Sequence, residues 1–437
     1  MGTPRATVIV TGTEVLGGWV SDRNGPWLAR QLGALGVEHV STVTVGDRPA
    51  DLRAALEHAR DQGYELIVTS GGLGPTEDDL TAATVAEFAG RPAALDEALE
   101  GRIWAILEPL SKRWKQISQE AIRSANRKQA MVPAGATVLE PVGTAPGLIV
   151  PPTDDDPSRP PTPTVVVMPG PPSELKPMWK TAEQQPAFRA AISEAVTLRE
   201  STWRLFGLPE SEIANTMKSA REVGIPIDDL EITTCVHRGE LEVVTRWTPE
   251  ADAVASAFEE FVGDQHAETL FSTDGRRIDE IVLDLLRERE WTIATAESCT
   301  GGLVAGRLTD RAGASDVVVG GIVSYSNAVK MRVLGVDAED LRDHGAVSAI
   351  VAQQMAQGAL NRLGAKIAVS TTGIAGPGGG SDAKPVGTVY VAVETVDGLS
   401  LVRHVQMPGD RAAVRDRTVT AALHMVRRVL LGEGERI

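Results

Sequence analysis

Short apolar runs alternate with segments of helical period through the first third of the chain. The apolar runs lie at residues 8–10, 40–45 and 66–68, and leucines between them recur at spacings of three and four residues. The order strand, helix, strand, helix, strand is typical of an α/β unit built on a mainly parallel sheet. Ligands bind such sheets beyond the carboxyl ends of the strands, so the loops after residues 10 and 68 are the places to search.

The pattern changes in the middle of the chain. A Pro-rich acidic stretch at residues 151–163 separates two apolar runs and predicts an exposed hairpin loop, because proline joins neither a helix nor a strand ladder. From about residue 202, alternating runs at 230–232 and 241–244 flank a turn, and a helical run follows at 253–262. We interpret this part as a small α+β middle unit.

The last part returns to the α/β pattern. A linker at residues 272–276 precedes a clean amphipathic helix that starts near Ile278. Strands are predicted at 292–295, 317–324 and 367–370, helices at 300–308, 328–334 and 350–363, and a hairpin at 389–405 around Asp397-Gly398. The chain then ends in a helix. The predicted domains are residues 1–180, 181–272 and 273–437, with an α/β fold at both ends and a small α+β domain between them.

Composition narrows the class of protein. The 437 residues carry 43 Lys and Arg against 59 Asp and Glu, a net charge of −16, which disfavours general nucleic-acid binding. No apolar run is long enough to span a membrane. Two cysteines supply neither a four-thiolate zinc site nor a disulfide scaffold, so we expect a reducing, cytoplasmic location.

Ser298 is a candidate nucleophile between a predicted buried strand and a predicted helix. We expect its hydroxyl at the positive end of that helix, with free N–H groups around Gly301 and Gly302 available to an oxyanion or a phosphate. The alternative is that Ser298 or Thr300 merely caps the helix and the glycines are packing spacers. Cys299 is a rival nucleophile, although most such cysteines are small core residues.

Lysine is the candidate base because no histidine lies close to Ser298 in the sequence. Lys330 falls in the first turn of the helix predicted after the strand at 317–324, where the helix dipole lowers the pKa of an amine. That property suits a Ser-Lys dyad, and Tyr325 could relay the proton or orient the amine. A lone lysine at such a position is otherwise usually a surface residue.

Two further segments carry candidate ligand-binding groups. A glycine-rich loop at residues 370–380 ends the third strand of the last unit and offers backbone amides, or is simply a mobile surface loop. Arg411, at the start of the last helix, is a candidate phosphate partner or a solvated side chain. In the first unit, residues 70–81 combine a glycine loop with acidic residues, which suits a phosphate and a cation but also a helix N-terminus.

The motifs of the last 160 residues resemble the nicotinamide-nucleotide amidase domain of CinA-type proteins. They are AESCTGG at 296–302, YSN at 325–327 with Lys330, GAVS at 345–348, TGIAGP at 372–377 and KPVGTV at 384–389. The resemblance implies hydrolysis of the amide of nicotinamide mononucleotide to nicotinate mononucleotide and ammonia, without a cofactor. It implies Ser298 as nucleophile and Lys330 as base, with Tyr325 as a third catalytic residue. The implied substrate-binding residues are Thr300, Gly301, Gly302, Asn327, Thr372, Gly373 and Arg411.

The first unit resembles the molybdopterin-binding fold found at the N-terminus of CinA proteins. The motifs are GGLGPT at 71–76 with Asp78 and Asp79, NRKQA at 126–130, GTAPG at 143–147 and MPGPP at 168–172. In some relatives this domain cleaves ADP-ribose with a divalent metal, which implies Asp78 and Asp79 as metal ligands. The implied nucleotide site consists of Glu14, Asp22, Asn24, Gly71, Gly72, Gly74, Thr76 and Asp78.

Three hypotheses follow from these patterns. The first is a cytoplasmic enzyme of pyridine-nucleotide salvage with two activities, a C-terminal amidase that takes a small nucleotide substrate and an N-terminal half that binds a nucleotide or pterin phosphate. This protein binds neither nucleic acid nor membrane and forms a homodimer. The second makes the chain chiefly a metal-dependent ADP-ribose pyrophosphatase. The third is a pterin-binding or competence-linked protein without catalysis.

Overall fold

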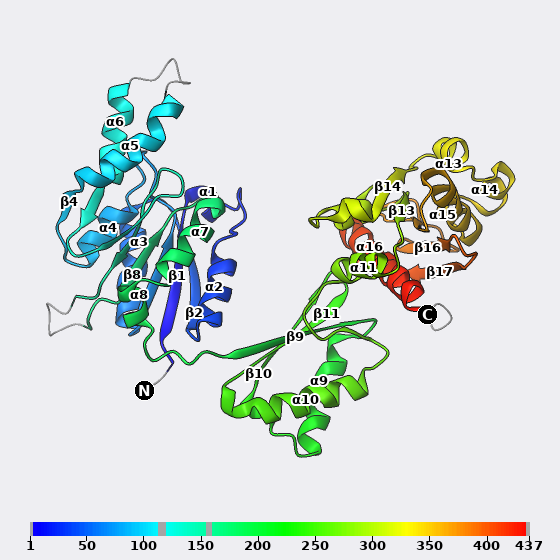
Figure 1. Cartoon of the computed structure of the whole chain (residues 1–437), viewed down its shortest axis with the longest axis horizontal. Coiled ribbons are helices and arrows are strands. Elements are labelled where there is room, and N and C mark those ends of the chain that lie inside the picture. Colours follow the sequence, from blue (N-terminus) through cyan, green and yellow to red (C-terminus); the bar gives the residue numbers. More distant parts are fainter. Residues whose placement is uncertain (1–2, 112–118, 154–159, 434–437) are drawn as a thin grey trace. The chain divides into compact units, whose positions relative to one another are not determined.

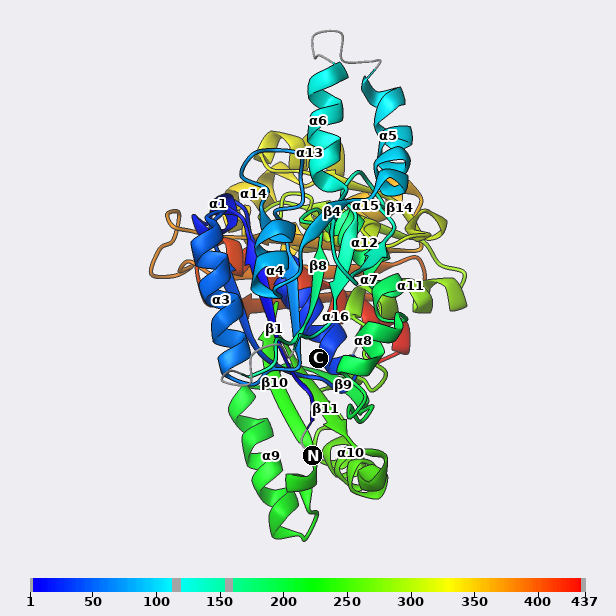
Figure 2. The same ribbon diagram turned by 90° about the vertical axis from the view of Figure 1, so that its left-hand side faces the viewer.

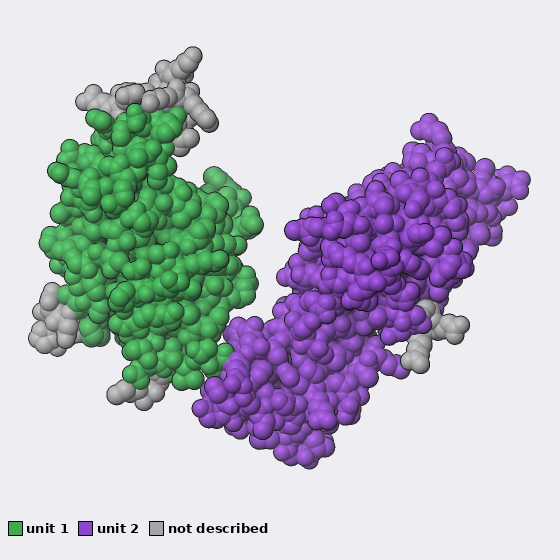
Figure 3. All heavy atoms as spheres, in the orientation of Figure 1, with its two compact units in different colours: residues 1–198 green, residues 199–437 purple. Residues whose placement is uncertain are grey.

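The computed structural model describes residues 3–111, 119–153 and 160–433. Two compact units make up the chain, residues 1–198 and residues 199–437 (Figure 3). The first holds a mainly parallel sheet, and the second holds an antiparallel sheet and a separate mixed sheet (Figure 1). This architecture confirms the predicted α/β class with a small α+β part between two α/β parts. No helix among the described residues is long and apolar enough to cross a lipid bilayer.

The sheet of the first unit has the strand order β2-β1-β3-β8-β7-β6. Strands β2, β1, β3 and β8 are parallel, whereas β7 and β6 run antiparallel to their neighbours. The strands are β1 (Arg5–Thr11), β2 (Glu38–Val45), β3 (Leu66–Ser70), β6 (Thr137–Leu139), β7 (Gly147–Val150) and β8 (Thr164–Met168), with a separate pair β4 (Ala93–Leu95) and β5 (Met131–Pro133). The pairing of β7 with β8 confirms a hairpin, but residues 154–159 of its predicted loop lie outside the described residues.

Helices cover both faces of this sheet. One face packs on α2, α7 and α8 around Trp179 and Phe188, and the other on α3 and α4 around Leu56 and Val85. Helices α5 and α6 pack side by side (Figures 1 and 2). The bounds are α1 (Thr13–Leu16), α2 (Gly25–Ala34), α3 (Pro49–Asp61), α4 (Thr81–Phe88), α5 (Glu97–Ser111), α6 (Gln119–Gln129), α7 (Pro172–Ala182) and α8 (Pro186–Ala191).

The second unit begins with a four-stranded antiparallel sheet of order β10-β11-β9-β12. Two helices, α9 and α10, supply much of the core that packs on this sheet, around Phe258 and Ile213. The elements are β9 (Arg199–Phe206), α9 (Glu210–Glu222), β10 (Glu231–His237), β11 (Glu240–Trp247), α10 (Asp252–Gln265) and β12 (Leu270–Ser272). The predicted middle hairpin and its helix are confirmed.

The mixed sheet of the second unit has the order β14-β13-β15-β16-β17, with β13 parallel to both of its neighbours. Successive residues of β13 face opposite sides, so that Ile293 packs with α11, α12 and α16 and Ala294 with α13, α14 and α15. The strands are β13 (Ile293–Glu297), β14 (Val318–Val323), β15 (Ile367–Gly373), β16 (Thr388–Thr395) and β17 (Ser400–Gln406). The helices are α11 (Ile278–Glu288), α12 (Leu303–Thr309), α13 (Asn327–Leu334), α14 (Ala338–His344), α15 (Ala349–Leu363) and α16 (Arg411–Leu431).

In the mixed-sheet part of the second unit, helices α12 and α14 differ from the sequence-based expectations. Helix α12 begins at Leu303, three residues later than predicted, because Gly301 and Gly302 have left-handed φ values of 61° and 99° that no α-helix accommodates. Helix α14 was not expected, since Leu341 is its only buried residue and produces no periodic pattern. Its signal was the N-cap: the carboxylate of Asp337 accepts from the N–H groups of Glu339 and Asp340.

Candidate active site

Three neighbouring strands of the mixed sheet end at one edge. Strands β14, β13 and β15 are parallel and adjacent, so the loops after Val323, Glu297 and Gly373 gather there. Ser298 follows β13 directly, and Lys330 lies in the first turn of α13, after β14. The edge that the sequence predicted as the site is therefore formed by those three loops.

Ser298 and Lys330 meet at this edge although 32 positions separate them. The Lys330 Nζ donates to Ser298 Oγ at 2.9 Å and to the carbonyl oxygen of Ser324 at 2.6 Å. The lysine side chain is 1% exposed. Burial lowers the pKa of the Lys330 amine from 10.5 to about 8, with desolvation as the largest cause. A hydroxyl held beside such an amine has a base within reach of its proton.

Glu297 is a site residue that the sequence analysis missed. Its buried carboxylate accepts from the N–H groups of Gly302, Val304 and Ala305 at 2.9, 3.1 and 2.8 Å, at the start of α12. The N–H of Gly301 donates to the carbonyl oxygen of Ser298 at 3.2 Å. The expectation of free N–H groups at Gly301 and Gly302 is therefore wrong, because chain atoms already accept from both. The sequence signal that could have identified Glu297 was an acidic residue at the end of a buried strand, just before a helix.

Two other N–H groups of the same turn face the buried sulfur of Cys299. Those of Cys299 and Thr300 donate to no oxygen of the described part of the chain and lie beside the Cys299 thiol. Burial raises the pKa of that thiol to about 11, so Cys299 stays protonated at neutral pH and is a poor nucleophile. The geometry therefore favours the hydroxyl of Ser298 over the thiol.

The remaining predicted residues fall into an exposed and a buried group. The exposed phenol of Tyr325 accepts from Arg411 Nη2 at 2.9 Å, and Arg411 Nη1 donates to the carbonyl oxygen of Gly376 at 2.8 Å. The backbone carbonyl oxygen of Tyr325 lies 3.5 Å from Lys330 Nζ. Asn327 is exposed at the start of α13. Tyr325 and Arg411 thus form an exposed hydrogen-bonded pair, and the backbone of Tyr325 reaches the Lys330 amine.

The buried group points inward. The Thr300 hydroxyl lies 2.6 Å from both Glu297 Oε2 and Thr371 Oγ1, and the Thr372 hydroxyl donates to the Ala346 carbonyl oxygen at 2.7 Å. Gly373 closes β15 where a Cβ would meet β16. The hydroxyls of Thr300 and Thr372 are therefore engaged within the protein.

The residues predicted for a nucleotide site in the first unit serve mainly local structure. Asp22 accepts from the N–H groups of Asn24 and Gly25 at 2.9 and 3.0 Å at the start of α2. The buried Asn24 amide donates to Ser70 Oγ and the Gly170 carbonyl, and Glu14 is exposed on α1. Gly71 and Gly72 adopt φ values of 109° and 63°, and a Cβ there would strike Thr11 and Thr81.

The predicted metal ligands lie together in the loop before α4. The Thr76 hydroxyl is 2.5 Å from carboxylate oxygens of both Asp78 and Asp79, and the Thr76 N–H donates to Asp79 at 2.9 Å. The hydrogen bond from Thr76 lowers the pKa of the Asp78 carboxyl. No group of three or more His, Cys, Asp and Glu side chains within residues 3–111, 119–153 and 160–433 is arranged to hold a metal. Two carboxylates alone would leave most ligands of a divalent cation to water or a substrate phosphate.

Comparisons with known proteins cover nearly the whole chain. Residues 275–430 match the CinA C-terminal domain family, and residues 7–189 match the family described as a probable molybdopterin binding domain. A CinA-like protein of Mycobacterium sp. (strain MCS) is 54% identical over 426 residues, which cover 98% of this chain and 99% of that protein. A CinA-like protein of Mycobacterium tuberculosis (strain ATCC 25177 / H37Ra) is 51% identical over 432 residues, which cover 98% of both. Among solved structures, competence/damage inducible protein CihA from Agrobacterium tumefaciens is 44% identical and covers 37% of this chain and 99% of its own, with a TM-score of 0.35.

Proposed function

This chain belongs to the CinA family, and from that premise we propose that its C-terminal part is an amidase that hydrolyses nicotinamide mononucleotide to nicotinate mononucleotide and ammonia. The observation that carries the proposal is the 2.9 Å hydrogen bond between Lys330 Nζ and Ser298 Oγ. The pairing of a serine hydroxyl with a buried amine is the arrangement that serine-lysine hydrolases use to activate the hydroxyl.

In the first half of the reaction, the neutral Lys330 amine takes the Ser298 proton while Oγ attacks the carboxamide carbon. The carbonyl oxygen becomes an oxyanion, and we assign its stabilisation to the N–H groups of Cys299 and Thr300, which donate to no oxygen of the described residues. When the tetrahedral intermediate collapses, the carbon–nitrogen bond breaks. Lys330 returns the proton to the departing nitrogen, so that ammonia leaves and an ester remains on Ser298.

The second half repeats the proton transfers with water. Lys330 takes a proton from a water molecule that attacks the ester carbon, and the Ser298–carbon bond breaks as Oγ regains the proton. One water is consumed, and the products are a carboxylic acid and ammonia, which at neutral pH become a carboxylate and an ammonium ion. The chemistry needs no metal, because the base, the nucleophile and the oxyanion donors all belong to the chain.

The pKa of the Lys330 amine determines the fraction of protein molecules in which this amine is neutral and can act as a base. At pH 7 an amine with a pKa of about 8 is roughly one-tenth neutral, against roughly one part in three thousand at an ordinary pKa of 10.5. Burial of Lys330 thus raises the fraction of active base about 300-fold. We assign to the exposed pair of Arg411 and Tyr325 contacts with the phosphate-bearing part of the substrate.

Ammonia release from nicotinamide mononucleotide by the pure protein, with chelator present, tests the proposal. Ser298→Ala and Lys330→Ala should each lose at least about a hundredfold in kcat. Lys366→Ala, an exposed lysine just before β15, is the matched control and should keep wild-type activity. A folded wild type without turnover, or a Lys330→Ala variant within tenfold of wild type, contradicts the proposal.

We also propose a second function, a metal-dependent cleavage of ADP-ribose by the first unit. The observation in its favour is a hollow beyond the end of β3 that Gly72, Asp79 and Lys128 line together, so that a cation, a carboxylate and a glycine backbone face one space. Asp78→Asn and Asp79→Asn should abolish Mn²⁺-dependent cleavage of ADP-ribose and leave ammonia release intact. If wild-type protein binds a pterin but cleaves no ADP-ribose, this unit is a binding domain instead.

A further inference from the structure

The first turns of helix α16 carry arginines, although cations are electrostatically unfavourable at that end of a helix. The N-terminus of a helix carries partial positive charge, so cations in the first turns are electrostatically disfavoured. Asp410 offsets part of this charge by accepting from the N–H of Ala413 at 2.9 Å. Arg415 is half-buried there and reaches the turn that carries Ser298: its Nε donates to the Cys299 carbonyl oxygen at 3.1 Å and its Nη2 to the Thr300 carbonyl oxygen at 2.8 Å.

These two hydrogen bonds fix the orientation of two peptide planes. In a trans peptide the C=O of one residue and the N–H of the next point in opposite directions. A guanidinium that holds the Cys299 carbonyl therefore turns the Thr300 N–H away from Arg415. The hydrogen bond from Arg415 to the Thr300 carbonyl likewise turns the Gly301 N–H away from Arg415. This N–H donates to the Ser298 carbonyl at 3.2 Å. A single rigid side chain thus sets the direction of the Thr300 N–H and closes the turn after Ser298.

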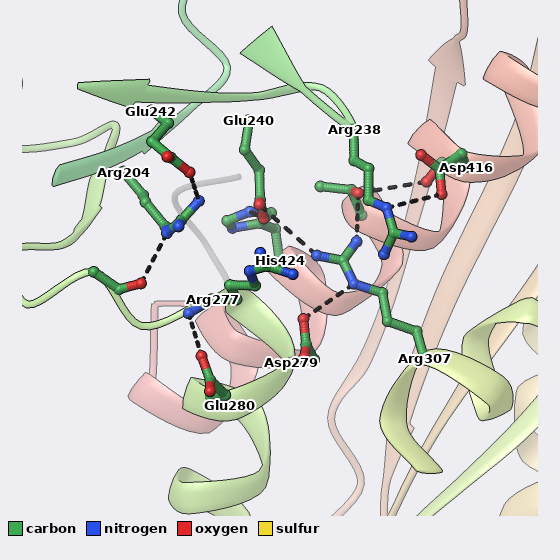
Figure 4. A network of polar contacts seen from close by, with 12 residues as sticks. Arg204, Arg238, Glu240, Glu242, Arg277, Asp279, Glu280, Arg307, Asp416 and His424 are labelled. Atoms are coloured by element: carbon green, nitrogen blue, oxygen red, sulfur yellow. Dashed lines mark hydrogen bonds and ion pairs between the residues drawn. The ribbon is translucent and has the colours of Figure 1, made fainter. Parts of the chain in front are cut away.

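The opposite side of α16 is anchored on the antiparallel sheet of the same unit (Figure 4). Glu240, at the start of β11, is 3% exposed and accepts from His424 Nε2 at 3.0 Å. Its carboxylate also lies 3.8 Å from Arg307, which donates to Thr420 Oγ1 at 2.7 Å. Nearby, Arg238 pairs with Asp416 at 3.6 Å.

The imidazole of His424 packs against two aromatic rings of the antiparallel sheet. It is stacked on Phe206 with 3.8 Å between ring centroids and meets Phe271 edge-on at 4.6 Å. Phe206 closes β9 and Phe271 lies in β12, so both rings belong to the antiparallel sheet. The contacts from Asp416 to His424 therefore hold the part of α16 that directly follows Arg415.

We propose that Arg415 is a positioning residue for the Ser298 turn, and that the antiparallel sheet, through Glu240, holds the helix that presents it. The inference rests on the proposed amidase function for its kinetic effect. The nucleophile would then depend on a side chain 117 positions away and on a sheet that contributes no group to the reaction itself. Within the described part of the chain, the hydrogen bonds of Arg415 go only to backbone carbonyls, so it acts through the turn and takes no part in proton transfer.

Labelling of Ser298 by a fluorophosphonate tests the positioning without relying on the natural substrate. In this reaction the Oγ–phosphorus bond forms, the phosphorus–fluorine bond breaks, fluoride leaves, and Lys330 takes the proton. Arg415→Ala should lower the labelling rate, and the kcat of ammonia release, by about 10- to 100-fold with KM within about threefold, because a misdirected oxyanion donor weakens the transition state alone. Arg362→Ala, an exposed arginine of α15, is the control and should match wild type.

Rescue separates positioning from a general loss of structure. Millimolar guanidinium should restore several-fold of the lost rate in Arg415→Ala and nothing in Arg415→Lys, whose ammonium cannot span both carbonyls. Glu240→Gln should lower the labelling rate in the wild-type background but add no further loss in Arg415→Ala, since the two residues act through one helix. Labelling within twofold of wild type in Arg415→Ala, or additive losses in the double variant, would overturn the inference. The labelling rates decide this even if nicotinamide mononucleotide is not the substrate.

Discussion

Replacing Lys330 with methionine should change the pH dependence of stability as well as remove the activity. The methionine keeps an apolar chain of similar length in the buried site but carries no charge. In the folded protein the amine has a pKa of about 8, whereas in the unfolded chain it has the ordinary value of 10.5. Between these two values the unfolded chain binds more protons than the folded one, so wild-type stability rises with pH across that window.

The magnitude follows from the two pKa values. Below about pH 8 the buried ammonium costs the wild type about 3 kcal/mol, since each pKa unit corresponds to about 1.4 kcal/mol. Most of this cost is relieved by pH 10. The difference in unfolding free energy between wild type and Lys330→Met should therefore shift by about 2 to 3 kcal/mol in favour of the wild type from pH 7 to pH 10. Any change in packing that the methionine causes cancels from this comparison, because it is the same at both pH values.

Hydrogen exchange of peptides covering β13 and α13 reports the opening free energy of this part of the chain. Lys366→Met is the control, because the side chain of Lys366 is exposed and should show no such shift. In wild type, kcat/KM should rise about tenfold per pH unit up to a midpoint near 8 and then level off. A flat rate profile between pH 6 and 9, or an unchanged stability difference between pH 7 and 10, would refute the assignment of a neutral buried amine.

Two further predictions concern the packing that supports the site. Arg307→Met should destabilise the second unit by up to about 3–5 kcal/mol, because it removes the guanidinium between the buried carboxylates of Asp279 and Glu240, whereas Arg238→Ala at the partly exposed pair should cost less than about 1 kcal/mol. Urea unfolding followed by hydrogen exchange measures both, and equal losses would contradict the reasoning. Gly358→Ala places a methyl group against the carbonyl oxygen of Leu334 and should cost at least about 1–3 kcal/mol, while Gly306→Ala, in open space within α12, should be neutral or stabilise by up to about 1 kcal/mol. Thermal unfolding of the two glycine variants side by side checks the difference in sign.

Much of the fold could be predicted because its signals are local. Buried strands such as β3 and β13 are short apolar runs, and the polar residues after them mark where each strand leaves the core. Helix α14 shows the limit of that reading, since one buried leucine forms no period. The parallel order β14-β13-β15 then follows from the alternation of strands and helices, and it brings the loops of Ser298 and Lys330 to one edge.

By itself the sequence determined which residue types stand at that edge, and the tertiary structure decided which atoms they meet. Burial, and with it the lowered pKa of Lys330, depends on how α13 packs, which no spacing reveals. The Gly302 N–H donates to the Glu297 carboxylate because the left-handed turn brings the two groups together. The Thr300 carbonyl accepts a hydrogen bond from Arg415, which lies 115 positions away in the sequence. Periodicity reports the face that an element buries, whereas the choice among competing hydrogen-bond partners is made only when distant elements have come together.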